Sequence, residues 1–247
     1  PPEVLLRPSP NNQLYSLSTA GQVVVSCVNT TTVMPDCINE DGSTNKGWTD
    51  KFNVTMSRAG PACVVKTLEQ ITNIRMDHYV VVDFKGFQNV VDAVGGVSVC
   101  LTDSVNDKKS HLKLPAGLST LDGKTALAFV RARKTLGDGS DISRIRRQQD
   151  FLASLARKAT SAGVLLNPKK VLDLINAIAG SLTTDPELGS IDGIKNIAMN
   201  LQDLRPSNIR FITAPNAPDP DNTANVKLTS EALDLWDALR EIGRAHV

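Results

Sequence analysis

Apolar positions along the chain follow two different spacings, which predict strands and helices. Short β-branched runs predict buried strands at residues 22–27, 78–84, 97–101 and 209–214. Elsewhere apolar residues recur every three or four positions, which is the spacing of one helical face. In residues 84–94 this face is made of Phe87, Val90, Val91 and Val94. Because that helix lies between two of the strands, the segment predicts a β-α-β unit.

Residues that start or stop helices mark the ends of the predicted segments. Pro61 suits the first turn of a helix that runs to about Asn73. Gly95 and Gly96 end the helix at residues 84–94, because glycine adopts a positive φ at little cost. Asp122 can cap a short helix through residues 126–130.

The rest of the chain predicts one long loop and several further helices. Residues 36–60 are polar and rich in Gly, Asn and Thr, so we expect a loop there. We expect a long helix from Asp141 or Ser143 to about residue 159. Pro168 opens another, whose apolar face ends at Leu182. The last two helices are expected near residues 191–201 and 229–242.

Helices that alternate with strands predict an α/β fold built in layers. No Pro-, Ser- or Gly-rich linker of useful length divides the 247 residues, so we expect one domain rather than two. A hydrophobic content of 41% is ample for its core.

Composition narrows the classes of function. The net charge is +1 and aromatic residues make up 4% of the chain, which together argue against nucleic-acid binding. No apolar run reaches the roughly 18 to 20 residues of a membrane-spanning helix, and the start has no signal-peptide pattern. We therefore expect a soluble fragment or mature form.

The cysteines allow more than one interpretation. The four cysteines lack CxxC spacing and three histidines accompany them, which disfavours a zinc site. One or two disulfides, or plain buried thiols, both remain open. The cysteines are Cys27, Cys37, Cys63 and Cys100.

One segment is far more basic than the rest of the chain. If the backbone after the short helix is extended, Arg131 and Arg133 point the same way. In the helix that follows, Arg144, Arg147 and Gln148 share one face. Two pairs of guanidinium groups could then converge on one anion. Because arginine presents planar forks of donors to phosphate oxygens, the segment suggests a pyrophosphate clamp.

A blander interpretation uses the same residues. A run of charges is usually a solvated helix face, here with ion pairs to Asp138, Asp141 and Asp150. Nucleic-acid binding needs similar side chains, but the net charge disfavours it. Spacing alone does not decide between a clamp and a solvated face.

Three segments taken together carry a family resemblance. They are DHYVVVDFKGFQNVVDAVGGVSV, LDGKTALAFVRAR and DISRIRRQQ, beginning at residues 77, 121 and 141. In order and spacing they resemble the signature blocks of the LytR-CpsA-Psr family, and the likeness extends over roughly residues 23–214. The matching positions are Asp77, Tyr79, Asp92, Gly95, Gly96, Val97, Arg131, Arg133, Asp141, Arg144, Arg147 and Gln148.

The resemblance implies a fold, an activity and a location. It implies a three-layer α/β/α sandwich around a mixed central sheet, here a single domain over residues 23–247 after a poorly matched segment 1–22. Such proteins move a glycopolymer from a polyprenyl pyrophosphate onto peptidoglycan or a related acceptor. They lie outside the cytoplasm at the cell surface, anchored to the cytoplasmic membrane by an N-terminal helix.

The resemblance also implies roles for individual residues. Arg131, Arg133, Arg144 and Arg147 would hold the pyrophosphate, with Asp141 orienting one or more of them and Gln148 contributing to binding. Lys51 and Asn53 match a KxN element that lies near the phosphate in relatives. The segments ending at Cys37 and Cys63 resemble PDC and PAC segments of actinobacterial members, which favours a disulfide between them.

The metal site departs from the family pattern. The family uses Mg²⁺ with the pyrophosphate, held in part by the Asp of an SIPRD-like motif. Asn29 stands here where that motif has Arg, and Thr30 stands where it has Asp. An amide and a hydroxyl do not replace a guanidinium or a carboxylate ligand. The sequence therefore names no metal ligand and leaves two main functions, a transferase or a non-catalytic polyprenyl-phosphate binding module.

Overall fold

The computed structural model describes most of the chain, in two compact units. The described residues are 4–7, 22–26, 30–39, 41–76, 78–108, 110–132, 141–161, 169, 179–190, 192–193 and 209–244. One unit comprises residues 3–81 and 210–247, and the other comprises residues 82–209. The single domain over residues 23–247 stays a prediction.

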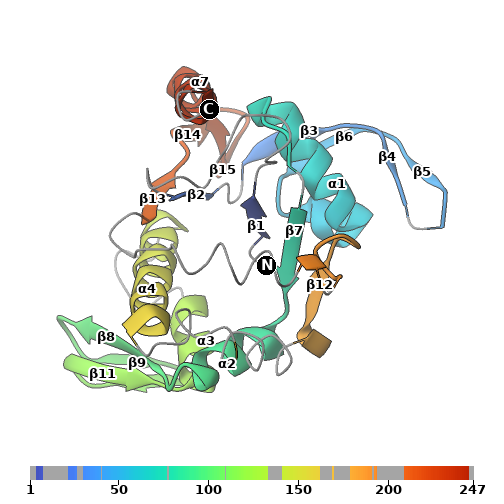
Figure 1. Cartoon of the computed structure of the whole chain (residues 1–247). Helices are drawn as coiled ribbons and strands as arrows, with labels where there is room; N and C mark the ends of the chain where they lie inside the picture. Colours follow the sequence, from blue (N-terminus) through green and yellow to red (C-terminus); the bar gives the residue numbers. More distant parts are fainter. Residues whose placement is uncertain are drawn as a thin grey trace. The chain divides into compact units, whose positions relative to one another are not determined.

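The first unit combines small sheets with the helices α1 and α7 (Figure 1). Its elements are β1 (Val4–Arg7), β2 (Gln22–Ser26), β3 (Thr31–Met34), β4 (Cys37–Ile38), β5 (Thr44–Asn45), β6 (Trp48–Lys51), α1 (Val54–Thr72), β7 (His78–Val82), β13 (Ile209–Thr213), β14 (Asn216–Asp219), β15 (Asn222–Leu228) and α7 (Ser230–Arg244). β7 pairs antiparallel with β1, and β13 pairs with β2. β2, β7 and β13 confirm the strands predicted at residues 22–27, 78–84 and 209–214.

The prediction of a loop over residues 36–60 is wrong. β3 pairs antiparallel with β6, and β4 pairs with β5, so the segment forms a ribbon with β4 and β5 at its far end (Figure 1). Along β3 the side chains alternate, with Met34 1% exposed and Val33 61% exposed. Strand pairing satisfies backbone groups whatever the side chains are, so the polar composition of this segment was a poor guide.

α1 begins at Val54, earlier than the predicted start at Pro61. Gly60 has a φ of 72° inside the helix and divides it into two parts. Glycine adopts this conformation without a Cβ clash, and Pro61 then suits the first turn of the second part. The predicted end at Asn73 is confirmed, because Asn73 is the left-handed C-cap and its N–H donates to the Glu69 carbonyl.

A hairpin and a helix complete the first unit. β14 pairs antiparallel with β15, with an irregularity between Pro218 and Asp219. α7, which confirms the predicted final helix, buries Trp236 to 2% exposure against Ala214 and Ala232. The hairpin was not predicted, although the turn-forming run PDPDN at residues 218–222 was a signal for it.

The second unit has its own core. Its elements are α2 (Phe84–Ala93), β8 (Val97–Leu101), β9 (Val105–Asp107), β10 (Leu112–Leu114), β11 (Gly117–Leu121), α3 (Gly123–Arg131), α4 (Asp141–Ser161), the 3₁₀ turn η2 (Ala179–Ser181) and β12 (Leu182–Thr184). The predicted helices at residues 84–94, 126–130 and 141–159 are confirmed. Their apolar faces meet in one cluster, which includes Val91, Val97, Leu121, Phe129 and Phe151.

Two predictions for the second unit need correction. β8 pairs antiparallel with β11, so the described pairings do not join β7 to β8 in the expected β-α-β manner. The partner of β8 in these pairings is β11, which follows it in the chain after the antiparallel pair β9 and β10. Leu182 begins β12 rather than lying on a helix. Of the rest of the helix predicted from Pro168, Lys169 is helical and residues 179–181 form the 3₁₀ turn η2 instead. The other residues of that helix, and most of residues 191–201, lie outside the described residues.

The predicted α/β class is confirmed by this mixture of helices and several small sheets. Among the described residues, no helix is both long and apolar enough to cross a membrane.

Candidate functional site

The position of Arg131 depends on how α3 packs against α2. Gly123 begins α3, and its N–H donates to the Asp92 carboxylate at the end of α2 over 2.7 Å. An ideal Cβ on Gly123 would lie 2.3 Å from the Gln88 carbonyl oxygen, so the two backbones touch there. At the other ends of the helices, the Arg131 guanidinium lies over the Phe84 ring, 4.5 Å from its centroid. The helices are therefore antiparallel neighbours in fixed register (Figure 1).

The face of α4 that was predicted to bind an anion reaches the end of α3. The Arg147 guanidinium donates to the Ala132 carbonyl, and the Gln148 side-chain amide donates to the Val130 carbonyl over 3.2 Å. These two carbonyls flank Arg131 in the chain. Arg147 and Gln148 thus join the third signature block to the end of the second block, which carries Arg131.

Both predicted clamp arginines whose side chains are described, Arg131 and Arg147, lie over phenylalanine rings. The Arg147 guanidinium is 5.8 Å from the centroid of Phe129, a buried core residue. Arg131 is exposed and rests on Phe84, which is itself 46% exposed. The structure does not describe the side chains of the other predicted clamp residues. Arg133 lies outside the described residues, and the side chains of Asp141 and Arg144 on α4 are not described.

The KxN element lies in the other unit. Lys51 ends β6 opposite Thr31, and Asn53 is the N-cap residue of α1. The Asn53 side chain makes no capping hydrogen bond, and its Oδ1 is a buried atom without a hydrogen-bond partner in the described part of the chain. The hydroxyl oxygen of Thr55, near the start of the helix, is also buried without a hydrogen-bond partner in the described part of the chain.

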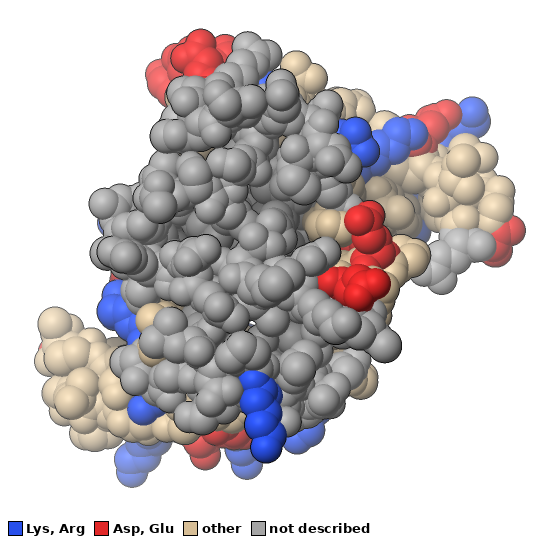
Figure 2. Space-filling view, in the orientation of Figure 1, with Lys and Arg blue, Asp and Glu red and all other residues tan. Residues whose placement is uncertain are grey.

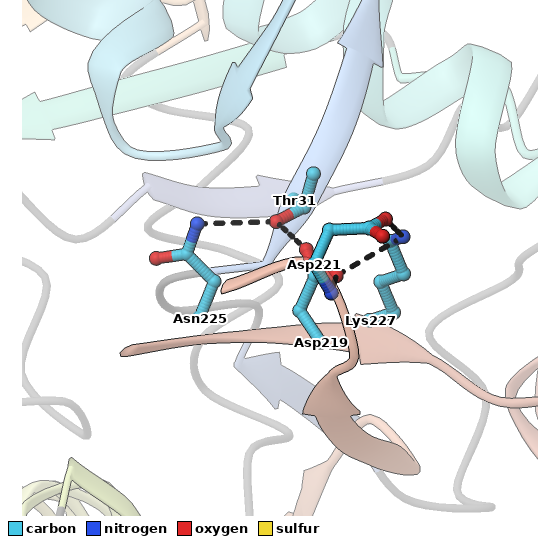
Figure 3. Close-up of polar contacts among 5 residues, drawn as sticks. All are labelled: Thr31, Asp219, Asp221, Asn225 and Lys227. Atoms are coloured by element: carbon cyan, nitrogen blue, oxygen red, sulfur yellow. Dashed lines mark hydrogen bonds and ion pairs between the residues drawn. The ribbon is translucent and has the colours of Figure 1, made fainter. Parts of the chain in front are cut away.

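The segment that departs from the family's metal motif packs against the C-terminal hairpin. Thr30 is 3% exposed and forms a bridge to Val226 of β15. The neighbouring Thr31 hydroxyl donates to Asp219 Oδ2 over 2.6 Å, and Asn225 Nδ2 donates to the Thr31 hydroxyl over 3.3 Å (Figure 3). The hairpin, close to the position of the missing Asp, therefore carries a buried carboxylate.

This carboxylate has its own partners. Lys227 Nζ lies 3.0 Å from Asp219 Oδ1 and 2.8 Å from Asp221 Oδ2, and the Asp221 N–H donates to Asp219 (Figure 3). The hydroxyl of Thr31 is the largest cause that lowers the pKa of Asp219. The two carboxylates raise the pKa of Lys227. Sequence reasoning missed this network, since Thr31 lies 188 positions from Asp219 and 194 positions from Asn225.

The described donors do not fit a magnesium ion. No group of three or more His, Cys, Asp or Glu side chains comes together within the part of the chain that the structure describes. The Asp219 carboxylate already accepts hydrogen bonds from the Thr31 hydroxyl and the Asp221 N–H, and it forms an ion pair with Lys227. Hard cations prefer several oxygen ligands, which Thr30 and Asp219 do not supply together here.

The cysteines are partly paired. A disulfide joins Cys37 of β4 to Cys63 of α1, with 5.6 Å between their Cα atoms. It ties the β3–β6 ribbon to the second part of α1. Cys100 on β8 is a free, exposed thiol, and Cys27 lies outside the described residues.

Positive and negative side chains are mixed on the surface of the described residues. On the face drawn in Figure 2, the described Lys and Arg side chains are interspersed with Asp and Glu. This agrees with a net charge of +1 and with a local rather than general attraction for anions.

Comparison with known proteins gives these contacts their context. The family model described as LytR_cpsA_psr family matches residues 25–241. The chain belongs to this family. The resemblance of its three signature blocks is thereby confirmed, and the junction of α2, α3 and α4 is where the LytR-CpsA-Psr blocks of this chain meet.

Individual relatives agree with the family assignment. The cell wall biosynthesis protein LcpA of Corynebacterium glutamicum is 38% identical over 176 residues, which are 71% of this chain and 32% of LcpA. The polyisoprenyl-teichoic acid–peptidoglycan teichoic acid transferase TagT of Bacillus subtilis is 28% identical over 175 residues, 66% of this chain and 53% of TagT. The chain thus spans about a third to a half of these relatives.

A solved structure supports the fold. The LytR-Csp2A-Psr enzyme from Actinomyces oris superposes with a TM-score of 0.68 at 25% identity, covering 96% of this chain and 84% of that chain. The α/β fold of this chain is therefore that of LytR-CpsA-Psr domains.

Proposed function

We propose that this chain is a glycopolymer transferase domain. It would move a glycan from a polyprenyl pyrophosphate carrier onto peptidoglycan or a related acceptor. The name of TagT, a polyisoprenyl-teichoic acid–peptidoglycan teichoic acid transferase, supports this class of reaction. The name of LcpA supports a role in cell wall biosynthesis.

The junction of the signature blocks is the observation that carries the proposal. Arg147 and Gln148 donate to the carbonyls of Ala132 and Val130, which flank Arg131. The arginines of two separate sequence blocks are therefore held at one end of α3. Guanidinium groups held in this way suit a pyrophosphate, because they present paired donors to its oxygens.

The proposed chemistry is a phosphoryl-type transfer. An acceptor sugar hydroxyl attacks the phosphorus attached to the glycopolymer and releases its proton to solvent. The P–O bond to the lipid phosphate breaks, and the lipid phosphate leaves. Arg131 and Arg147 would stabilise the charge that develops on the phosphate oxygens, together with Arg133 and Arg144. Asp141 would orient one or more of the arginines, and Lys51, Asn53 and Gln148 would contribute to substrate binding.

We derive no step through a metal ion. Magnesium is a family expectation that the described donors do not fit, since Thr30 replaces a carboxylate and no acidic cluster is found among the described residues. A non-catalytic module that binds polyprenyl phosphate is the weaker alternative, because it draws no support from the names of the relatives.

We place the domain outside the cytoplasm, at the cell surface and anchored to the cytoplasmic membrane. The disulfide between Cys37 and Cys63 agrees with an oxidising compartment. The proposed anchor is a separate membrane helix on the N-terminal side of the domain.

Calorimetric titration with a soluble short-chain prenyl pyrophosphate tests the proposal. Arg131→Ala and Arg147→Ala should each weaken binding by about tenfold or more, the usual loss for a charge-assisted contact. Arg157→Ala is the matched control, because Arg157 is an exposed arginine on the same helix that donates to Ser154. Unchanged binding in both clamp variants would refute the clamp. Transfer assays with a peptidoglycan acceptor then separate a transferase from a binding module.

A further inference from the structure

Phe84 is an apolar residue in an unusual place. It is the first residue of α2 and 46% of its surface is exposed, although large apolar side chains usually favour the core. Its ring carries the guanidinium of Arg131 at 4.5 Å from the centroid. At this distance the guanidinium and the exposed ring form a cation–π contact, so the ring does more than pack against its neighbours.

The position of the ring is closely determined. Asp83 is the N-cap of α2, and its carboxylate accepts a hydrogen bond from the Gly86 N–H over 2.6 Å. The Asp83 N–H donates to the Ser181 carbonyl over 3.2 Å. The start of α2 is therefore held by two hydrogen bonds, while the contact between Asp92 and Gly123 sets its register against α3.

An aromatic ring beneath an exposed arginine can strengthen the binding of an anion by that arginine. A long, mobile side chain loses rotamer freedom when it binds an anion, and this loss weakens binding. An aromatic face that holds the guanidinium beforehand reduces the loss. A guanidinium stacked flat on a ring also keeps its N–H donors in its own plane, where they stay available for oxygen acceptors.

The second described clamp residue repeats the arrangement. Arg147 lies over Phe129, whose ring is 6.3 Å from that of Phe151, and Phe151 in turn lies 5.6 Å from Phe87. Two of the six phenylalanines in the chain thus lie beneath the two arginines, and two more continue the ring contacts behind Phe129. Phe87, Phe129 and Phe151 belong to or pack against the core cluster of the second unit, whereas Phe84 is exposed.

We propose that Phe84 is a positioning residue that orders the Arg131 guanidinium for the phosphate groups of the carrier. This inference rests on the proposed function, since it assumes that Arg131 binds pyrophosphate. Phe84 acts through Arg131, and it is not itself assigned a contact with the reacting atoms.

The test compares substitutions that keep or remove the aromatic face. Phe84→Leu keeps an apolar side chain without a ring, and it should weaken binding of a soluble short-chain prenyl pyrophosphate by about fivefold. Phe84→Tyr keeps the ring and should stay within about twofold of the unmodified chain. Leu118→Ala is the control for loss of an exposed apolar side chain in the same unit, where Leu118 is 76% exposed, and it should change nothing.

A double substitution separates positioning from a direct contact with the lipid. Phe84→Leu should have no further effect once Arg131→Ala is present, because the ring then has no guanidinium to hold. An equal loss in both backgrounds would overturn the proposal and point to a lipid contact instead. Unchanged binding in Phe84→Leu with weakened binding in Arg131→Ala would also overturn it, while the proposed function would stand. Unchanged binding in Arg131→Ala would remove the proposed clamp role itself.

Discussion

The Asp92 carboxylate accepts a hydrogen bond from the backbone N–H of Gly123, with 2.7 Å between the two atoms. Asp92 lies near the end of α2 and Gly123 begins α3, so the bond satisfies a helix-terminal donor and joins two signature blocks. Together with the close approach of Gly123 to the backbone of Gln88, this contact sets which residues meet at the far ends of the two helices. Phe84 and Arg131 are the residues that meet.

The close approach at Gly123 predicts a strong effect of a small substitution. Gly123→Ala would place a methyl group 2.3 Å from the Gln88 carbonyl oxygen, a contact that backbone must shift to relieve. We expect the free energy of unfolding to fall by about 1 to 3 kcal/mol. Pyrophosphate binding should weaken as well, because α3 carries Arg131. Urea unfolding and calorimetric titration measure the two effects.

Gly180→Ala is the matched control for this prediction. A Cβ on Gly180 would meet no atom within 4 Å, so stability should be unchanged there. Equal stability of the two variants would show that α2 and α3 are not packed as closely as described.

The disulfide predicts a large contribution to stability. Replacing Cys37 and Cys63 together by Ala should lower the free energy of unfolding by about 3 kcal/mol, because the bond joins cysteines 26 positions apart and closes that loop in the unfolded chain. Cys100→Ala removes a free exposed thiol and should have little effect. Peptide mapping without reduction should recover the linked peptides. Recovery of both thiols in free form would contradict the bond.

The hairpin network predicts a dependence of stability on pH. The pKa of Asp219 is lowered, mainly by the Thr31 hydroxyl, so its folded-state pKa lies below the unfolded value of about 3.9. The charged carboxylate therefore stabilises the fold above that value, and the stabilisation is lost as pH falls through the folded-state pKa. Asp219→Asn should be less stable than the unmodified chain at about pH 7, with a smaller difference near pH 2.

Thermal unfolding at both pH values checks this expectation. Asp234→Asn serves as the control, because Asp234 is an exposed residue of α7 in the same unit. A difference between Asp219→Asn and the unmodified chain that stays constant over the pH range would show that charge is not the cause.

The departure at Thr30 predicts weak dependence on magnesium. The clamp arginines form charge-assisted hydrogen bonds without a metal, so adding Mg²⁺ after EDTA should change the dissociation constant of a short-chain prenyl pyrophosphate by less than about tenfold. Titration calorimetry under the two conditions measures the change. A much larger Mg²⁺ effect would mean that carboxylates outside the described residues rebuild the site.

Several local features were predictable from the sequence because they are decided within a few residues. Asp122 caps α3 through the Thr125 N–H, Asn73 closes α1, and Gly95 and Gly96 adopt positive φ after α2. Each depends on one side chain or on one backbone angle close to where it acts. The signature spacing of Arg131, Arg147 and Gln148 was likewise readable along the chain, and so was the family.

The tertiary structure alone decided which of these residues meet. The polar run at residues 36–60 contains strands because β3 and β6 supply each other's hydrogen-bond partners, a pairing that composition does not reveal. The bond between Thr31 and Asp219 spans 188 positions, and the contact between Phe84 and Arg131 depends on the register of two helices. Capping and turn preferences act over a few residues and fix where elements begin and end. Contacts between distant segments depend on how whole elements pack, which no local pattern records.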